Sequence, residues 1–145
     1  MKCLLQRVKE AQVQINGKTH GHIDHGLLVF ICAEHGDTED SVRKAVDKIL
    51  KLRIFSDPEG KMNLSLAQVA GGLLVISQFT LAADTSRGNR PSFTNAASPQ
   101  LGEALYQHFL DYAKSQHPLV ANGVFGADMQ VHLINDGPVT IPLEF

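Results

Sequence analysis

The stretch Leu73-Leu74-Val75-Ile76-Ser77-Gln78-Phe79-Thr80-Leu81 joins a continuous apolar run to a polar segment, and it decides how the chain is interpreted. A short run of large apolar residues is typical of a strand buried on both faces. Hydroxyl and carboxamide groups at the end of such a strand need hydrogen-bond partners. A second segment of this kind, Asn135-Asp136-Gly137-Pro138-Val139-Thr140, follows the alternating residues 129–134. Because loops on a rigid scaffold concentrate binding and catalysis, the two segments predict one site built largely from backbone groups and small side chains.

The N-terminal part of the chain predicts strands joined by tight turns. Residues 1–8 and 12–15 are expected strands, and Asn16-Gly17 is a strong hairpin signal because both turn positions accept positive φ. Residues 26–33 form a continuous apolar run, which predicts another buried strand. Residues 53–64 predict a further hairpin, turning at Asp57-Pro58-Glu59-Gly60.

Two segments carry the pattern of amphipathic helices. Asp37 or Thr38 is a candidate N-cap for the first, and Ser98 followed by Pro99 begins the second. The apolar stripes expected to face the core are Val42, Ala45, Val46, Ile49 and Leu50 in the first helix and Leu101, Leu105, Phe109 and Tyr112 in the second. Between the polar segment and the second helix, residues 82–97 form an irregular stretch, and structureless loops of more than about 12–15 residues are uncommon in a compact domain. This length indicates a loop that is functional or disordered.

Three further strands are expected at residues 120–125, 128–134 and 139–144. Most connections between strands are too short for crossover helices, so we expect a mainly antiparallel sheet, curled like a barrel, with two helices packed on it. The predicted class is therefore α+β, in a single domain spanning residues 1–145.

Composition indicates a soluble, cytoplasmic protein. No apolar stretch reaches the roughly 18 residues of a membrane span, and residues 1–7 are too short and too soon charged for a signal peptide. Cys3 and Cys32 lie within apolar, strand-like runs, which favours buried thiols in a reduced environment over a disulfide.

The two polar segments also carry a family resemblance. Ser77-Gln78-Phe79-Thr80-Leu81 and the later N-x-G-P-x-T pattern resemble the two signature motifs of D-aminoacyl-tRNA deacylases, which clear D-amino acids from tRNA. The likeness extends over nearly the whole chain, through the blocks Gln6-Arg7-Val8, Leu52-Arg53-Ile54-Phe55, Gly60-Lys61-Met62-Asn63-Leu64-Ser65, Arg90-Pro91-Ser92-Phe93 and Phe125-Gly126-Ala127-Asp128-Met129. Both motifs, in order and with these blocks between them, form a specific signal.

The resemblance implies a homodimeric editing hydrolase that needs no cofactor or metal. It implies that Gly137-Pro138 is a cis peptide whose carbonyl groups enter the active site of the partner subunit and exclude L-amino acids, with Arg7 fixing the orientation of that segment. Phe125 and Met129 are implied to form part of the wall near the terminal adenosine of the tRNA. Glycine lacks a side chain that such a wedge could reject, so glycyl-tRNA is an expected second substrate.

Catalysis is expected to rest on backbone donors and on the RNA. The N–H groups around Phe79 and Thr80 are candidate oxyanion donors, Gln78 positions substrate or backbone, and the tRNA 2′-hydroxyl assists the attacking water. Alternatives remain open: a hydrolase that uses Thr80 or Ser77 as a side-chain nucleophile, or a non-catalytic RNA-binding module. A nucleophile would need a paired base, and no histidine is coupled to these hydroxyls by its spacing.

Charge and histidine content bear on the partner and on metals. The formal net charge is −2, with local basic clusters at Lys44, Lys48, Lys51 and Arg53 and at Arg87 and Arg90. Because long nucleic-acid contacts normally require a basic stripe, this balance favours contact limited to the acceptor end of the tRNA. The cluster His20, His22 and His25 is better explained as an exposed edge than as a metal site.

Overall fold

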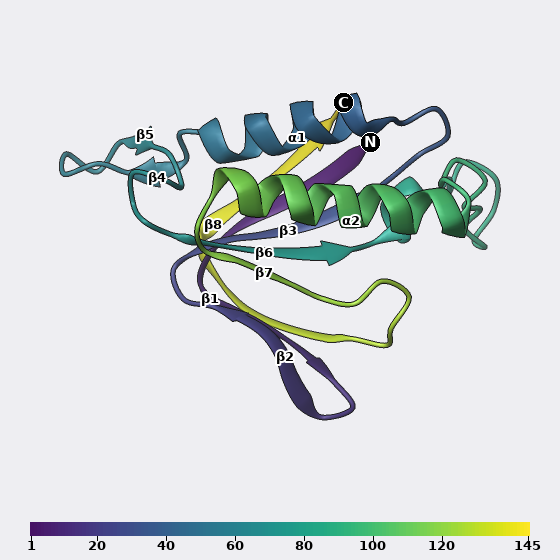
Figure 1. Ribbon diagram of the computed structural model, residues 1–145, viewed down its shortest axis with the longest axis horizontal. Helices are drawn as coiled ribbons and strands as arrows, with labels where there is room; N and C mark the ends of the chain where they lie inside the picture. Colours follow the sequence, from purple (N-terminus) through teal and green to yellow (C-terminus); the bar gives the residue numbers. More distant parts are fainter.

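The computed structural model describes residues 1–145, and it forms a bent, nearly closed sheet with two helices on one face (Figure 1). The elements are β1 (Lys2–Ile15), β2 (Lys18–Ile23), β3 (Gly26–Cys32), α1 (Glu39–Lys51), β4 (Phe55–Ser56), β5 (Met62–Leu64), β6 (Gly72–Ser77), the 3₁₀ turn η1 (Phe79–Ala82), α2 (Pro99–Gln116), β7 (Val120–Asn122) and β8 (Gln130–Glu144).

The main sheet has the strand order β2-β1-β3-β6-β7, and β8 pairs with β1 along the other edge of that strand. The three pairings made by β1 are antiparallel, whereas β3–β6 and β6–β7 are parallel. The predicted α+β class with a curled sheet and two helices is confirmed. The expectation of short connections concerned most of the strands, and the two parallel pairs are the exceptions: α1 lies between β3 and β6 in the chain, and α2 lies between β6 and β7.

Two long strands replace the shorter ones expected from the sequence. β1 is continuous where residues 1–8 and 12–15 were expected to be separate, and its partner changes along its length from β3 to β2. Register shifts between Gln6 and Val8 and between Val8 and Glu10 mark irregularities in its ladder with β8. The predicted hairpin turn is confirmed, with φ of 50° at Asn16 and 75° at Gly17.

Two apolar clusters explain the sequence pattern of the central strands. The larger lies between the sheet and the helices, and the smaller lies inside the curled sheet, where its buried members are Val8, Ala11, Val13, Ile23, Leu28, Leu74 and Ile76. β6 contributes to both clusters because it is covered on both faces, and this is why its sequence is apolar without alternation. Cys3 and Cys32 are free, buried thiols, as predicted.

The helix starts follow the predicted caps. Thr38 caps α1, and its backbone N–H donates to Ser41 Oγ at 3.3 Å. Ser98 Oγ accepts the N–H of Leu101 at 3.3 Å, and Pro99 occupies the first helical position of α2. Neither helix has the length and apolarity needed to cross a membrane.

Candidate active site

The chain turns sharply at the end of β6, and this turn creates the site. Gln78 N–H donates to Ile31 O at 2.8 Å, which extends the parallel ladder with β3 by one residue. The chain then enters η1, where Leu81 N–H donates to Gln78 O at 3.2 Å and Ala83 N–H to Thr80 O at 3.1 Å. The first N–H groups of a helical turn have no acceptor within it, so Phe79 and Thr80 offer backbone donors at this end of the sheet.

An open cleft of about 610 Å³ lies at this turn. Its walls come from the end of β6, the loop before α2 and the loop between β7 and β8. The lining residues are Ile76, Ser77, Gln78, Phe79, Phe93, Ala96, Ala97, Pro99, Phe125, Gly126, Ala127, Asp128, Met129 and Val131. The structure therefore brings five of the predicted site residues, Ser77, Gln78, Phe79, Phe125 and Met129, into one cleft.

Thr80 is exposed and does not line the cleft. Its hydroxyl accepts a hydrogen bond from Gln78 Nε2 at 2.5 Å, and this bond fixes the orientation of both side chains. No histidine lines the cleft, and the only ionisable side chain along it is Asp128. A side-chain nucleophile at Thr80 consequently has no paired base of the kind that activation requires.

Two buried side chains beneath the site hold it in place, and the sequence analysis assigned neither of them a role there. Tyr106 of α2 places its hydroxyl 3.0 Å from Val75 O and 3.1 Å from Gly123 O, which ties β6 to the start of the β7–β8 loop. Burial raises the pKa of the Tyr106 hydroxyl, so it keeps its proton as a donor. The Cys32 thiol donates to Phe79 O at 3.5 Å, and burial raises the pKa of this thiol above its usual value.

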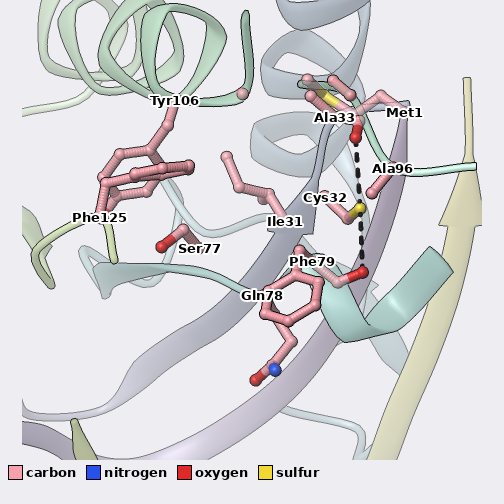
Figure 2. Close-up of a pocket in the computed structure, with 12 residues that line it drawn as sticks. Met1, Ile31, Cys32, Ala33, Ser77, Gln78, Phe79, Ala96, Tyr106 and Phe125 are labelled. Carbon is pink, nitrogen blue, oxygen red and sulfur yellow. Dashed lines mark hydrogen bonds between the residues drawn. The ribbon is translucent and has the colours of Figure 1, made fainter. Parts of the chain in front are cut away.

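Beneath the turn lies a small, mostly apolar cavity of about 40 Å³. Figure 2 shows Tyr106, Phe125 and Ser77 on one side of it, Cys32 and Ala33 on the other, and Ile31 between them. The packing beneath the turn is thus continuous with the wall of the cleft at Ser77, Phe79 and Phe125. No local sequence pattern links these residues, because they lie on four separate segments.

The second predicted segment forms a clamped loop within β8. The Gly137-Pro138 peptide bond is cis, and both residues are exposed. Asn135 closes the loop at its base: its Nδ2 donates to Val139 O at 3.1 Å and its Oδ1 accepts Val139 N–H at 2.9 Å. Sequence reasoning quoted Asn135 within the motif but assigned it no role.

Arg7 is nearly buried, with 9% of its surface exposed, and it holds the same loop from β1. Its Nε donates to Asp136 O at 2.8 Å, and its Nη1 donates to Ile54 O at 2.7 Å. The Asp136 carboxylate lies 3.6 Å from Nε. Arg7 therefore contacts the carbonyl one residue before the Gly137-Pro138 pair, and not the carbonyls of that pair.

Within one chain, the cleft and the clamped loop are separate. Arg7 pairs with Leu27 of β3, whereas Ser77 pairs with Ile31 of the same strand. Four residues along a strand correspond to about 13 Å. Neither Gly137 nor Pro138 lines the cleft.

The histidines of the β2 region have other neighbours. His22 Nε2 lies 3.7 Å from Asp24, and the ring of His25 packs edge-on against Phe55 with centroids 5.1 Å apart. No group of three or more His, Cys, Asp or Glu side chains is arranged to hold a metal ion.

A cleft that combines an apolar wall with a few placed polar groups is typical of an enzyme site. Comparison with known proteins defines the class. The family described as D-Tyr-tRNA(Tyr) deacylase matches residues 4–144. A D-aminoacyl-tRNA deacylase of Variovorax paradoxus (strain S110) is 61% identical over 144 residues, which cover 99% of each chain. One of Azoarcus sp. (strain BH72) is 62% identical over 143 residues, covering 99% of this chain and 95% of the relative.

Two solved structures have the same fold. A protein titled c-Myc DNA Unwinding Element Binding Protein superposes with a TM-score of 0.95 at 38% identity, covering 100% of this chain and 99% of the other. A probable eukaryotic D-amino acid tRNA deacylase gives a TM-score of 0.83 at 19% identity, covering 98% and 97%, and this likeness concerns the fold alone. The chain belongs to the D-Tyr-tRNA(Tyr) deacylase family. The predicted family and the predicted hydrolase class are confirmed.

Proposed function

We propose that this chain hydrolyses the ester between a D-amino acid, or glycine, and the 3′-terminal ribose of tRNA, and that it leaves L-aminoacyl-tRNA intact. Family membership and the names of the most similar relatives support the reaction. Such an activity returns free amino acid and free tRNA, and so it edits mischarged tRNA. A cytoplasmic location is part of the proposal, because aminoacyl-tRNA is made and used in the cytoplasm.

The observation that carries the mechanism is the turn at the end of β6. Phe79 and Thr80 present backbone N–H groups without acceptors in η1, next to a cleft that contains no histidine. Hydrolysis of an ester passes through a tetrahedral intermediate with a negative oxygen. Preorganised backbone donors stabilise that oxygen by roughly 2.7–4 kcal/mol each. An aminoacyl ester is already activated, so positioning and oxyanion stabilisation supply most of what the protein must contribute.

The substrate itself supplies the polar group that assists the attacking water. The 2′-hydroxyl beside the ester is placed to accept a hydrogen bond from the attacking water and to pass a proton to the departing 3′-oxygen. Water adds to the carbonyl carbon, the carbon–oxygen ester bond breaks, and the proton of the water ends on the ribose oxygen. Ser77 and Gln78 position the substrate at this turn, while Phe125 and Met129 pack against the terminal adenosine. The requirement for a 2′-hydroxyl would also explain a preference for RNA.

Selectivity is proposed to come from Gly137 and Pro138 of a second copy of the chain. The loop that carries them is exposed and is held by Arg7 and Asn135. Along β3, the partner of Arg7 lies four residues, or about 13 Å, from the partner of Ser77 in the cleft of the same chain. A homodimer would place this loop in the partner's cleft, where its backbone collides with any L side chain. D-amino acids and glycine avoid that collision.

The test is a matched set of esters. The protein is incubated with D- and L-tyrosyl-tRNA, with glycyl-tRNA on a non-cognate tRNA, and with a chromogenic acetate ester, and release of the acyl group is followed. Rapid release from the D-tyrosyl and glycyl substrates, with slow release from the L-tyrosyl substrate, is the expected result. Equal rates on both enantiomers, or a clear preference for the chromogenic ester, would contradict the proposal.

A further inference from the structure

The loop between η1 and α2 borders the cleft, and it contains a charged hairpin that has no role in the proposed hydrolysis. Asp84 and Ser92 pair as an antiparallel bridge, with N–H···O distances of 2.8 and 2.9 Å, so residues 84–92 form a small closed hairpin. Its base adjoins Phe93, which lines the cleft. Figure 1 shows this segment at the right-hand end of the molecule, beyond the first turn of α2.

Two cations on this hairpin lack partners. Arg87 and Arg90 are exposed, and no salt bridge in the structure includes either of them. The single carboxylate of the hairpin, Asp84, instead accepts the N–H of Ser86 at 2.9 Å within its own turn. By contrast, three of the four basic residues of α1, Arg43, Lys44 and Lys51, lie within 4.0 Å of a carboxylate, as in the contact of 2.7 Å between Lys44 Nζ and Asp40. The hairpin therefore carries uncompensated positive charge beside the cleft.

A pair of aromatic rings, one exposed and one half-buried, lies at the edge of the cleft next to the hairpin. Phe79 is 59% exposed, and its ring meets that of Phe93 edge to face, with centroids 5.0 Å apart. Leaving this much of a phenylalanine in water is unfavourable, and the edge contact with Phe93 leaves the ring available to a further partner. Stacking aromatics beside backbone-neutralising arginines are the standard elements of single-stranded RNA recognition.

We propose that the single-stranded 3′ end of the tRNA leaves the cleft across this surface. The base that precedes the terminal adenosine stacks on Phe79, and Arg87 and Arg90 contact the phosphates on its 5′ side. This inference rests on the proposed function, because it takes the terminal adenosine to lie in the cleft. It assigns the path of the RNA to the 84–92 hairpin rather than to the basic face of α1.

Binding at different salt concentrations tests the arginines. The probe is an RNA hairpin ending in CCA whose terminal ribose carries D-tyrosine in a stable amide linkage. For single-stranded RNA, each phosphate contact contributes about 0.7 to the slope of log affinity against log salt. Arg87→Gln with Arg90→Gln should therefore lower that slope by about 1.4. The matched control, Lys44→Gln with Lys48→Gln on α1, should leave it unchanged.

A second measurement tests the aromatic platform. With the same probe, Phe79→Leu should weaken binding roughly tenfold or more, the effect of losing one base–aromatic stack. Removing the base next to the terminal adenosine should weaken wild-type binding to a similar extent, and the two changes together should cost little more than either one. Fully additive losses would overturn the stacking assignment.

The outcomes separate this inference from the proposed function. Hydrolysis of D-tyrosyl-adenosine, which contains no phosphate and no second base, tests the reaction alone. An unchanged salt slope in the Arg87/Arg90 variant overturns the inference even when hydrolysis is normal. A slope lowered only by the Lys44/Lys48 variant overturns it as well, and assigns the RNA to the α1 face.

Discussion

Replacing Arg7 with lysine should reduce chiral discrimination more than it reduces hydrolysis. Arg7 donates hydrogen bonds to two carbonyl groups on different segments, that of Asp136 from Nε and that of Ile54 from Nη1. A lysine keeps the charge but has one nitrogen in place of a planar fork, so it reproduces at most one of these contacts. Losing a hydrogen bond from a charged donor costs about 1.5–3 kcal/mol. That free energy is below the stability of a typical domain, so the variant should remain folded.

The same free energy sets the size of the effect on selectivity. If it is lost from the loop around Gly137 and Pro138, the ratio of correctly held to released loop falls by roughly tenfold or more, so the released fraction that admits L substrates rises by a similar factor. The ratio of deacylation rates on D- and L-tyrosyl-tRNA should fall by a similar factor. The rate on the D substrate should change by only a few fold, because the proposed oxyanion donors, the N–H groups of Phe79 and Thr80, lie on η1, and Arg7 makes no hydrogen bond to η1.

The assay compares initial rates on both enantiomers at equal tRNA concentration, with oligomeric state checked by light scattering. Arg53→Lys is the matched control, since Arg53 also donates to a carbonyl, that of Asn63 at 2.9 Å, but on an exposed hairpin. Arg7→Ala is less informative because it leaves both carbonyls without their donor. A D/L ratio that stays at the wild-type value in a folded Arg7→Lys variant would refute the proposed role of Arg7.

Three further predictions address the cleft. Thr80→Ala should keep the rate on D-tyrosyl-tRNA within about tenfold of wild type, because it removes one exposed hydrogen bond with Gln78; a loss of several orders of magnitude in a folded variant would favour a threonine nucleophile. A D-aminoacyl-tRNA with a 2′-deoxy terminal ribose, charged on its 3′-oxygen, should be hydrolysed orders of magnitude more slowly than the natural substrate, and an unchanged single-turnover rate would eliminate the RNA-assisted mechanism. Gly123→Ala should raise KM for D-tyrosyl-adenosine, because a Cβ there would lie 2.6 Å from Met129 Sδ and push that side chain out of place; Met129→Ala should raise KM to a similar extent, and the double variant should be little worse than either one, whereas a normal KM in the Gly123→Ala variant would contradict steric displacement.

Local chemistry made much of the fold predictable. The Asn16-Gly17 turn, the Thr38 and Ser98 caps and the buried run of β6 each follow from the residues at those positions. The continuity of β1 was not predictable, because its residues change partners along one strand and the local pattern records only burial. The parallel pairs were missed for a related reason: a helical crossover fixes strand direction only once the tertiary packing is known.

The sequence predicted which residues line the cleft, but not which buried side chains hold those residues in place. The polar segment after β6 and the resemblance identified Ser77, Gln78, Phe79, Phe125 and Met129, which line one cleft. Tyr106 and Cys32, which pack beneath these residues, could not be identified in the same way, because a tyrosine or cysteine within an apolar pattern predicts only a core residue. Their role depends on which carbonyls they reach, and that is a property of the folded chain.

The rate of hydrolysis and the discrimination between D and L substrates are expected to depend on different parts of the structure, because of the way in which enantiomers must be distinguished. Favourable contacts with a side chain differ by only about 1–3 kcal/mol per methylene, and D-amino acids vary in size and polarity. A site that accepts all of them gains selectivity only by excluding the mirror-image position with a rigid group. The loop at Gly137 is held by Asn135 and Arg7, whereas the proposed oxyanion donors at Phe79 and Thr80 lie in the turn after β6. Substitutions that loosen the loop should therefore admit L substrates without slowing D substrates, and substitutions at the turn should slow every substrate while leaving the D/L ratio intact.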